Sequence, residues 1–172
     1  ECRLIAETYD LPIHIVIGVV SALSPNNKWT SNIANARDMI RAWDGHHHID
    51  DFSVSTYNAM KEKAWSILNS DRMLTSAEVK VILNGKKIVC FFENILGEDN
   101  TCTIDGHARN IAYNQRVNLT NGKTSIGKLE YANLQEAYRQ ASKRCRVNGR
   151  RLKAYELQAI TWVTWRKMHN IA

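Results

Sequence analysis

The sequence predicts an all-α protein, because three observations favour helices over strands. Few segments alternate apolar and polar residues with the period of two of a half-buried strand, whereas apolar residues recur at steps of three and four. Only two prolines and eight glycines interrupt the 172 residues. Hydrophobic residues make up 44% of the chain, which is normal for a globular protein and argues against disorder. We therefore expect one compact helical domain, or two small helical lobes.

Six segments show helical periodicity, and we expect a helix in each: 27–43, 55–68, 75–83, 87–96, 129–145 and 153–168. In the first segment, apolar residues from Trp29 to Trp43 fall on one face of a helix. In the third, Thr75 and Glu78 have the spacing of a capping box. Residues 87–96 are apolar all round, so we expect that helix to be central.

A tight turn, Asn84-Gly85, joins the third expected helix to the fourth. Both residue types tolerate a left-handed backbone, which a helical hairpin requires. The second helix then begins beside Lys86 and Lys87. A helix N-terminus with two ammonium groups favours an anion such as a DNA phosphate. A plain helical corner with solvated lysines would have the same sequence, and on this segment alone we favour that interpretation.

Residues 103–110, TIDGHARN, place Asp105, His107 and Arg109 at alternate positions after the apolar helix. Asp105 lies where a new helix begins, and aspartate is a good N-cap. Arg109 follows one turn later on the same face, and we expect it to pair with Asp105 or with phosphate. An aspartate at a helix start is usually only a cap, so a chemical role depends on what precedes it.

The order of these parts resembles the helix-hairpin-helix DNA glycosylase superfamily. The endonuclease III branch of that superfamily reads roughly LPGVGRKTA at its hairpin and VDTH at its acid. When the hairpins are aligned on Gly85, Lys87 falls on the Schiff-base lysine of that branch, and the interval to Asp105 also fits. The likeness extends roughly over residues 15–113.

Two further segments carry the same resemblance. Residues 22–27, ALSPNN, are similar to the family's LLSAQ segment, and Asn26 matches the polar residue that fills the gap in the duplex. Residues 57–68 are similar to the family's YNSKAENI helix. The chain departs from the family in two ways: its hairpin has Leu83 in place of a second glycine, and it lacks the iron–sulfur cysteines.

The resemblance implies a two-lobed helical fold and an enzyme that extrudes a damaged or modified base from duplex DNA and excises it. It implies one glycosylase-like unit over 1–172, with a central lobe of about 24–113 and a second lobe built from about 1–23 and 114–172. Asp105 would be the catalytic carboxylate, and Lys87 would decide whether the enzyme is also a lyase. The implied DNA-binding residues are Asn26, Asn84, Gly85, Lys86, His107 and Arg109.

Composition bounds the partners and the compartment. Lys and Arg number 23 against 17 Asp and Glu, a net charge of +6 that favours a polyanionic partner. The basic run 139–153 is either a solvated helix end or a flank of a DNA channel. No apolar stretch approaches the roughly 18 residues needed to span a bilayer. Four dispersed cysteines indicate a reducing compartment, so we expect an intracellular, cytoplasmic protein. We also expect a monomer and no membrane partner.

Three remaining features are assigned ordinary roles. The histidines at 46–48 are consecutive and point in different directions, so we expect a surface loop and no metal; nor do we expect a small-molecule cofactor. Trp162 and Trp165 are expected in the core, or next to a base-binding pocket. Residues 118–128 are expected to form a loop or a link between lobes.

Two other functions remain open from the sequence. One is a binding module that keeps the fold and holds duplex DNA without catalysis. The other is an interaction protein that inhibits or partners another enzyme, with its basic surface aimed at an acidic protein.

Overall fold

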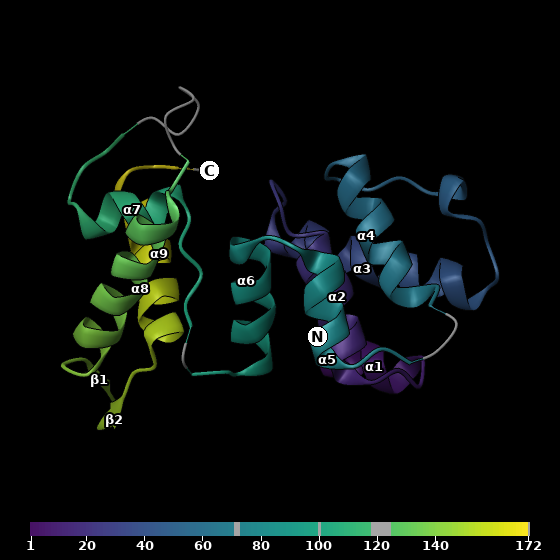
Figure 1. The fold of residues 1–172 in the computed structure, drawn as a ribbon, viewed down its shortest axis with the longest axis horizontal. Helices are drawn as coiled ribbons and strands as arrows, with labels where there is room; N and C mark the ends of the chain where they lie inside the picture. Colours follow the sequence, from purple (N-terminus) through teal and green to yellow (C-terminus); the bar gives the residue numbers. More distant parts are fainter. Residues whose placement is uncertain (71–72, 100, 118–124, 172) are drawn as a thin grey trace. The chain divides into compact units, whose positions relative to one another are not determined.

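A computed structural model describes residues 1–70, 73–99, 101–117 and 125–171 of the chain (Figure 1). These residues form nine α-helices, one 3-10 helix and a ribbon of two very short strands, which confirms the all-α class. They divide into two compact units, residues 1–96 and residues 97–172, and each unit is described by itself. The loop expected over 118–128 falls mainly on 118–124, outside the described residues.

Unit 1 contains six α-helices and the 3-10 helix. They are α1 (Cys2–Thr8), α2 (Ile13–Ala22), α3 (Trp29–Asp44), η1 (Ile49–Asp51), α4 (Asn58–Leu68), α5 (Ser76–Leu83) and α6 (Lys86–Leu96). The predicted capping box is confirmed, because the Thr75 hydroxyl accepts from the Glu78 N–H and the Glu78 carboxylate accepts from the Thr75 N–H. The helix expected over 55–68 begins only at Asn58, with Tyr57 as its N-cap.

The centre of unit 1 is α2, which contacts all five other α-helices of the unit. Every residue from Ile15 to Ala22 is buried, as expected of a helix that is apolar on all sides. Gly18 allows close packing at this centre, since a Cβ there would lie 2.7 Å from the Val79 Cγ1 atom. The prediction that 87–96 forms the central helix is wrong, because α6 buries only Cys90 and Phe92.

Unit 2 contains three α-helices and the ribbon. They are α7 (Gly106–Ala112), α8 (Lys128–Ser142), β1 (Arg146–Val147), β2 (Arg150–Arg151) and α9 (Ala154–Met168). Its core consists of apolar and aromatic side chains from the three helices and from the segment before α7: Cys102, Ile104, Ala108, Tyr131, Leu134, Tyr138, Ala154 and Leu157. The helix expected over 129–145 ends at Ser142, because the chain turns there toward the ribbon.

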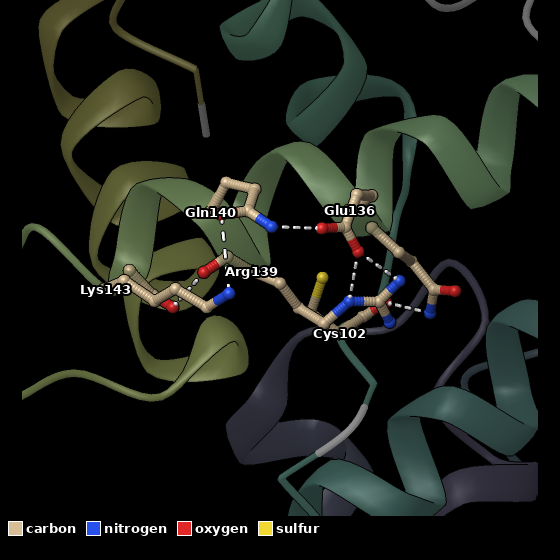
Figure 2. A network of polar contacts seen from close by, with 7 residues as sticks. Cys102, Glu136, Arg139, Gln140 and Lys143 are labelled. Atoms are coloured by element: carbon tan, nitrogen blue, oxygen red, sulfur yellow. Dashed lines mark hydrogen bonds and ion pairs between the residues drawn. The ribbon is translucent and has the colours of Figure 1, made fainter.

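Helix α8 holds the segment that leads into α7. The Tyr131 hydroxyl accepts from the Ile104 N–H at 3.1 Å, and the Gln135 amide donates to the Cys102 carbonyl at 2.9 Å. On the exposed face of α8, Figure 2 shows Glu136 accepting hydrogen bonds from Arg139 and Gln140. These two bonds lower the pKa of the Glu136 carboxyl below its usual range.

The division into units differs from the lobes that the resemblance implies. Residues 1–23 belong to unit 1, because α2 is the centre of its core. Residues 97–113 belong to unit 2, because side chains of α8 hydrogen-bond the backbone before α7.

Candidate functional site

The turn between α5 and α6 has the backbone that the sequence predicts. Asn84 has φ 39° and Gly85 has φ 126°, so both residues adopt positive φ. The Lys63 ammonium donates to the Leu83 carbonyl at 2.7 Å and to the Asn84 carbonyl at 3.2 Å. These bonds satisfy carbonyl groups that the end of α5 leaves without helical partners, so the turn is held from α4.

The side chains that follow the turn face solvent. Asn84, Gly85, Lys86 and Lys87 are all exposed, and a Cβ at Gly85 would meet no atom within 4 Å. The first turn of an α-helix presents N–H groups that lack intrahelical acceptors. A phosphate can therefore approach this turn without displacing protein atoms, and two ammonium groups lie next to it in sequence.

Asn26 lies at the same end of unit 1 as this turn. The His14 imidazole Nε2 is 2.7 Å from the Leu74 carbonyl, and Gly18 packs on Val79. These two contacts show that α2 and α5 run in the same direction, so the loop after α2 lies beside the end of α5. Asn26 in this loop is exposed and has φ 52°, which asparagine tolerates.

Two aromatic side chains near this loop are exposed, although the helical periodicity of residues 27–43 and 55–68 places both among the apolar positions. Trp29 begins α3 and is 50% exposed, and Tyr57 precedes α4 and is 59% exposed. The Thr56 hydroxyl donates to the Pro25 carbonyl at 2.6 Å, which holds the start of α4 against the loop after α2. The apolar periodicity predicts burial correctly only beyond the first turn of each helix, where Ile33 and Ala64 are buried.

In unit 2, Asp105 is the N-cap of α7. Its Oδ1 atom accepts from the Ala108 N–H at 2.8 Å, which is the capping bond that the sequence predicts. Its Oδ2 atom accepts from the Trp162 indole N–H at 2.9 Å. The carboxylate is half-buried and is held by a donor on each oxygen, and each oxygen keeps capacity for a further bond.

The Trp162 ring is itself held on two sides. The His107 ring meets it edge-on, with centroids 5.9 Å apart and planes at 83°. The Arg166 guanidinium lies over the indole, 4.4 Å from its centroid. His107 is thus placed beside the partner of Asp105, and these contacts restrict the direction from which the indole N–H reaches the carboxylate.

Tyr138 of α8 supports the first turn of α7. Its hydroxyl donates to the Ala108 carbonyl at 3.3 Å. Burial raises the pKa of Tyr138 to about 12. The phenol therefore remains a neutral donor across the physiological pH range and keeps α7 against α8.

Arg109 does not pair with Asp105. Its Nε atom donates to the Glu130 carboxylate at 2.7 Å, and its guanidinium lies over the Tyr113 ring at 5.1 Å. The Asp105 carboxylate folds back onto its own helix as a cap, whereas the longer arginine side chain reaches α8. Arg109 therefore fastens α7 to α8 through an ion pair.

The structure thus brings the predicted residues together in two groups. Asn26, Asn84, Gly85, Lys86 and Lys87 lie at one end of unit 1, whereas Asp105, His107 and Arg109 lie at the start of α7 in unit 2. Sequence reasoning missed that Trp162 is the hydrogen-bond partner of Asp105. The one available signal was general: a partly buried indole N–H needs an acceptor.

The histidines at 46–48 are exposed, as expected of a surface loop. The His48 ring caps η1 by accepting from the Asp50 N–H at 3.4 Å. Across the described ranges, no group of three or more histidine, cysteine or acidic side chains is placed to hold a metal ion.

None of the described helices has both the length and the apolar character needed to cross a membrane.

Comparisons with known proteins give a family but no described activity. No curated protein and no solved structure matches the chain. A family model described as "Family of unknown function (DUF7178)" matches residues 2–169. Because the match covers nearly the whole chain, the protein belongs to the DUF7178 family.

Proposed function

We propose that the protein is a DNA N-glycosylase that extrudes a damaged or modified base from duplex DNA and cleaves its N-glycosidic bond. The observation that carries this proposal is the fixed carboxylate of Asp105, which is half-buried and bonded through one oxygen to α7 and through the other to Trp162. The exposed turn of unit 1 supplies the complementary DNA contact in this proposal.

The chemistry of base excision needs an acid held in this way. Cleavage of a base–sugar bond develops positive oxocarbenium charge on the deoxyribose. A carboxylate stabilises that charge most when donors have already oriented it, since no reorganisation is then needed during the reaction. Asp105 meets this requirement, because the Ala108 N–H and the Trp162 indole N–H restrain both oxygens.

DNA binding is supported by the end of unit 1. The turn at Asn84-Gly85 combines exposed backbone with the Lys86 and Lys87 ammonium groups. Asn26 lies at the same end, where a small polar side chain suits the gap that an extruded nucleotide leaves. In a bifunctional version of the enzyme, the Lys87 amine attacks the deoxyribose C1′ atom and displaces the base.

One observation favours a second candidate function, a DNA-binding module without catalysis. The two hydrogen bonds of Asp105 also serve a purely structural cap that connects α7 to α9. In that case the turn of unit 1 would still bind DNA, and Asp105 would contribute only to stability.

The test is incubation of the protein with duplexes that carry uracil, oxidised purines, alkylated bases, mismatches or modified pyrimidines. Mass spectrometry of the small-molecule fraction detects a freed base, and binding to the same duplexes is measured in parallel. A released base from one duplex class supports the glycosylase. Salt-dependent binding without release from any duplex supports the binding module. Affinity for an acidic protein that salt does not weaken, with none for DNA, contradicts both.

A further inference from the structure

The ribbon β1–β2 is a small, regular structure that carries three arginines. Arg146 and Val147 pair antiparallel with Arg151 and Arg150, in that order. The connecting residues Asn148 and Gly149 have φ 49° and 78°, the positive values of a tight type I′ hairpin turn. All four strand residues are exposed, and the Leu152 N–H donates to the Cys145 carbonyl at 3.1 Å to close the base of the ribbon.

The two faces of the ribbon differ. Directly opposed residues of an antiparallel pair place their side chains on the same face, so Arg146 and Arg151 share one face, and Val147 and Arg150 share the other. Arg150 makes a two-pronged ion pair with Glu156 of α9, with N–O distances of 2.9 and 3.0 Å. That pair ties the second face to α9 and leaves the Arg146 and Arg151 face open.

The open face places two like charges opposite each other without compensation. Opposed like charges destabilise a strand pair. Within the described part of the chain, neither Arg146 nor Arg151 has a carboxylate partner, although Arg146 donates from one nitrogen to the Gly149 carbonyl at 2.9 Å. Arg139 on α8 differs in this respect, since it pairs with the Glu136 carboxylate (Figure 2). An anionic partner would neutralise the positive charges of Arg146 and Arg151.

We propose that this arginine ribbon, residues 146–151, enters the major groove of duplex DNA as a second contact, separate from the turn between α5 and α6. The major groove of B-form DNA admits a two-stranded ribbon, whereas that of duplex RNA is too narrow. Arginine forks at the open face match phosphate oxygens or the guanine O6 and N7 atoms. The inference shares DNA with the proposed function but does not require base excision.

The test uses the full chain and a duplex without modified bases. The R146Q/R151Q double variant is compared with R37Q/R41Q, which removes the same charge from exposed arginines of α3. Fluorescence anisotropy over a salt series gives the affinity and its salt dependence. We expect the ribbon variant to lose about two phosphate contacts, a decrease of about 2 in the slope of log affinity against log salt. Its melting temperature should be unchanged or higher, since the opposed charges are gone.

Three results would overturn the ribbon proposal: equal affinity losses in the two double variants, an unchanged affinity in R146Q/R151Q, or equal affinity of the wild-type protein for duplex DNA, duplex RNA and polyglutamate. The R146K/R151K variant separates phosphate contact, which lysine keeps, from recognition of guanine, which needs the arginine fork. Base release is measured separately in the same variants, on the duplexes with damaged or modified bases that test the proposed function. Its absence from the wild-type protein contradicts the glycosylase alone, and unchanged DNA binding by R146Q/R151Q contradicts the ribbon alone.

Discussion

The two units hold their candidate residues by different means. In unit 1, Lys86 and Lys87 begin α6 directly after the exposed turn, and the bonds that fix the turn come from Lys63 to backbone carbonyls. In unit 2, Asp105 is half-buried, and the bonds that fix it end on its own carboxylate oxygens. Unit 1 therefore fixes a backbone beside its exposed charges, whereas unit 2 fixes the charge itself.

This difference suits two tasks. A long polyanion is held by several exposed cations, none of which needs a unique position. Stabilising charge on one sugar carbon requires an acid in one place. Substitutions at the end of unit 1 other than Lys87 should therefore change DNA affinity and its salt dependence, and substitutions around Asp105 should change the rate of base release. Lys87 is the exception, because in a bifunctional enzyme its amine would act on one sugar carbon.

The largest expected effect is on the covalent protein–DNA adduct that borohydride traps, and it distinguishes Lys87 from Lys86. If the Lys87 amine displaces the base, the imine that it forms is reduced by borohydride to a stable protein–DNA adduct. We expect Lys87→Ala to abolish the adduct and Lys86→Ala to keep it, as measured on a denaturing gel. The opposite pattern would contradict the alignment on Gly85, and no adduct with the wild-type protein would contradict a lyase.

The next largest effect is expected in the core of unit 1. Gly18→Ala places a Cβ 2.7 Å from the Val79 Cγ1 atom, and a branched side chain moves little. Overpacking costs about 1–3 kcal/mol, which a helix-propensity gain of about 1 kcal/mol offsets only in part. Urea unfolding of Gly18→Ala should therefore show a lower midpoint. DNA binding should also weaken, because α2 and α5 set the position of Asn26 beside the turn. Ser66→Ala, an exposed position inside α4 of the same unit, is the control, since it adds a helix-favouring alanine without overpacking; equal stability of the two variants would contradict this packing.

A smaller effect is expected from Trp162→Phe, which keeps an aromatic ring and removes the donor to Asp105. The loss of one hydrogen bond to a half-buried charge should cost about 1 kcal/mol of stability and slow base release. Trp165→Phe is a matched control on the same helix, because the Trp165 indole N–H has no hydrogen-bond partner within the described ranges. If Trp165→Phe slows base release as much as Trp162→Phe, the indole bond does not position the acid.

The last prediction concerns alkaline pH, outside the range in which the protein would act. The pKa of Tyr138 is raised to about 12 in the folded protein, above the value of about 10 for an unfolded tyrosine. The folded state therefore retains this proton longer, and its contribution to stability is complete below pH 10 and is lost as the pH rises through 12. Thermal melts in that window should show a smaller decline in Tyr138→Phe than in the wild-type protein. An identical decline would show that the Tyr138 phenol is not perturbed.

The predictable part of the fold is local. Spacing alone identified six of the helices, the Thr75 and Glu78 capping box, and the cap at Asp105, because each depends on residues within one or two turns. The Asn84-Gly85 turn was predictable for the same reason, since few other residue types accept its positive φ.

Long-range packing was not predictable from spacing. The partner of Asp105 is Trp162, on a helix at the far end of the sequence, and nothing in either segment specifies the other. Arg109 was expected near Asp105 from helix geometry, but Glu130 of α8 competes successfully for its guanidinium. The ribbon at 146–151 was missed because its strands contain two residues each, too few to show a period.

The most direct test of the central role of Asp105 is the rate of base release by Asp105→Asn. Asparagine caps a helix as well as aspartate does, so the Ala108 N–H keeps its acceptor and the fold should be retained, although the amide nitrogen replaces the oxygen that accepts from Trp162. We expect release to fall by about a hundredfold or more while the affinity for duplex DNA is unchanged. Release at the wild-type rate by a folded Asp105→Asn protein would contradict the assignment of Asp105 as the catalytic acid.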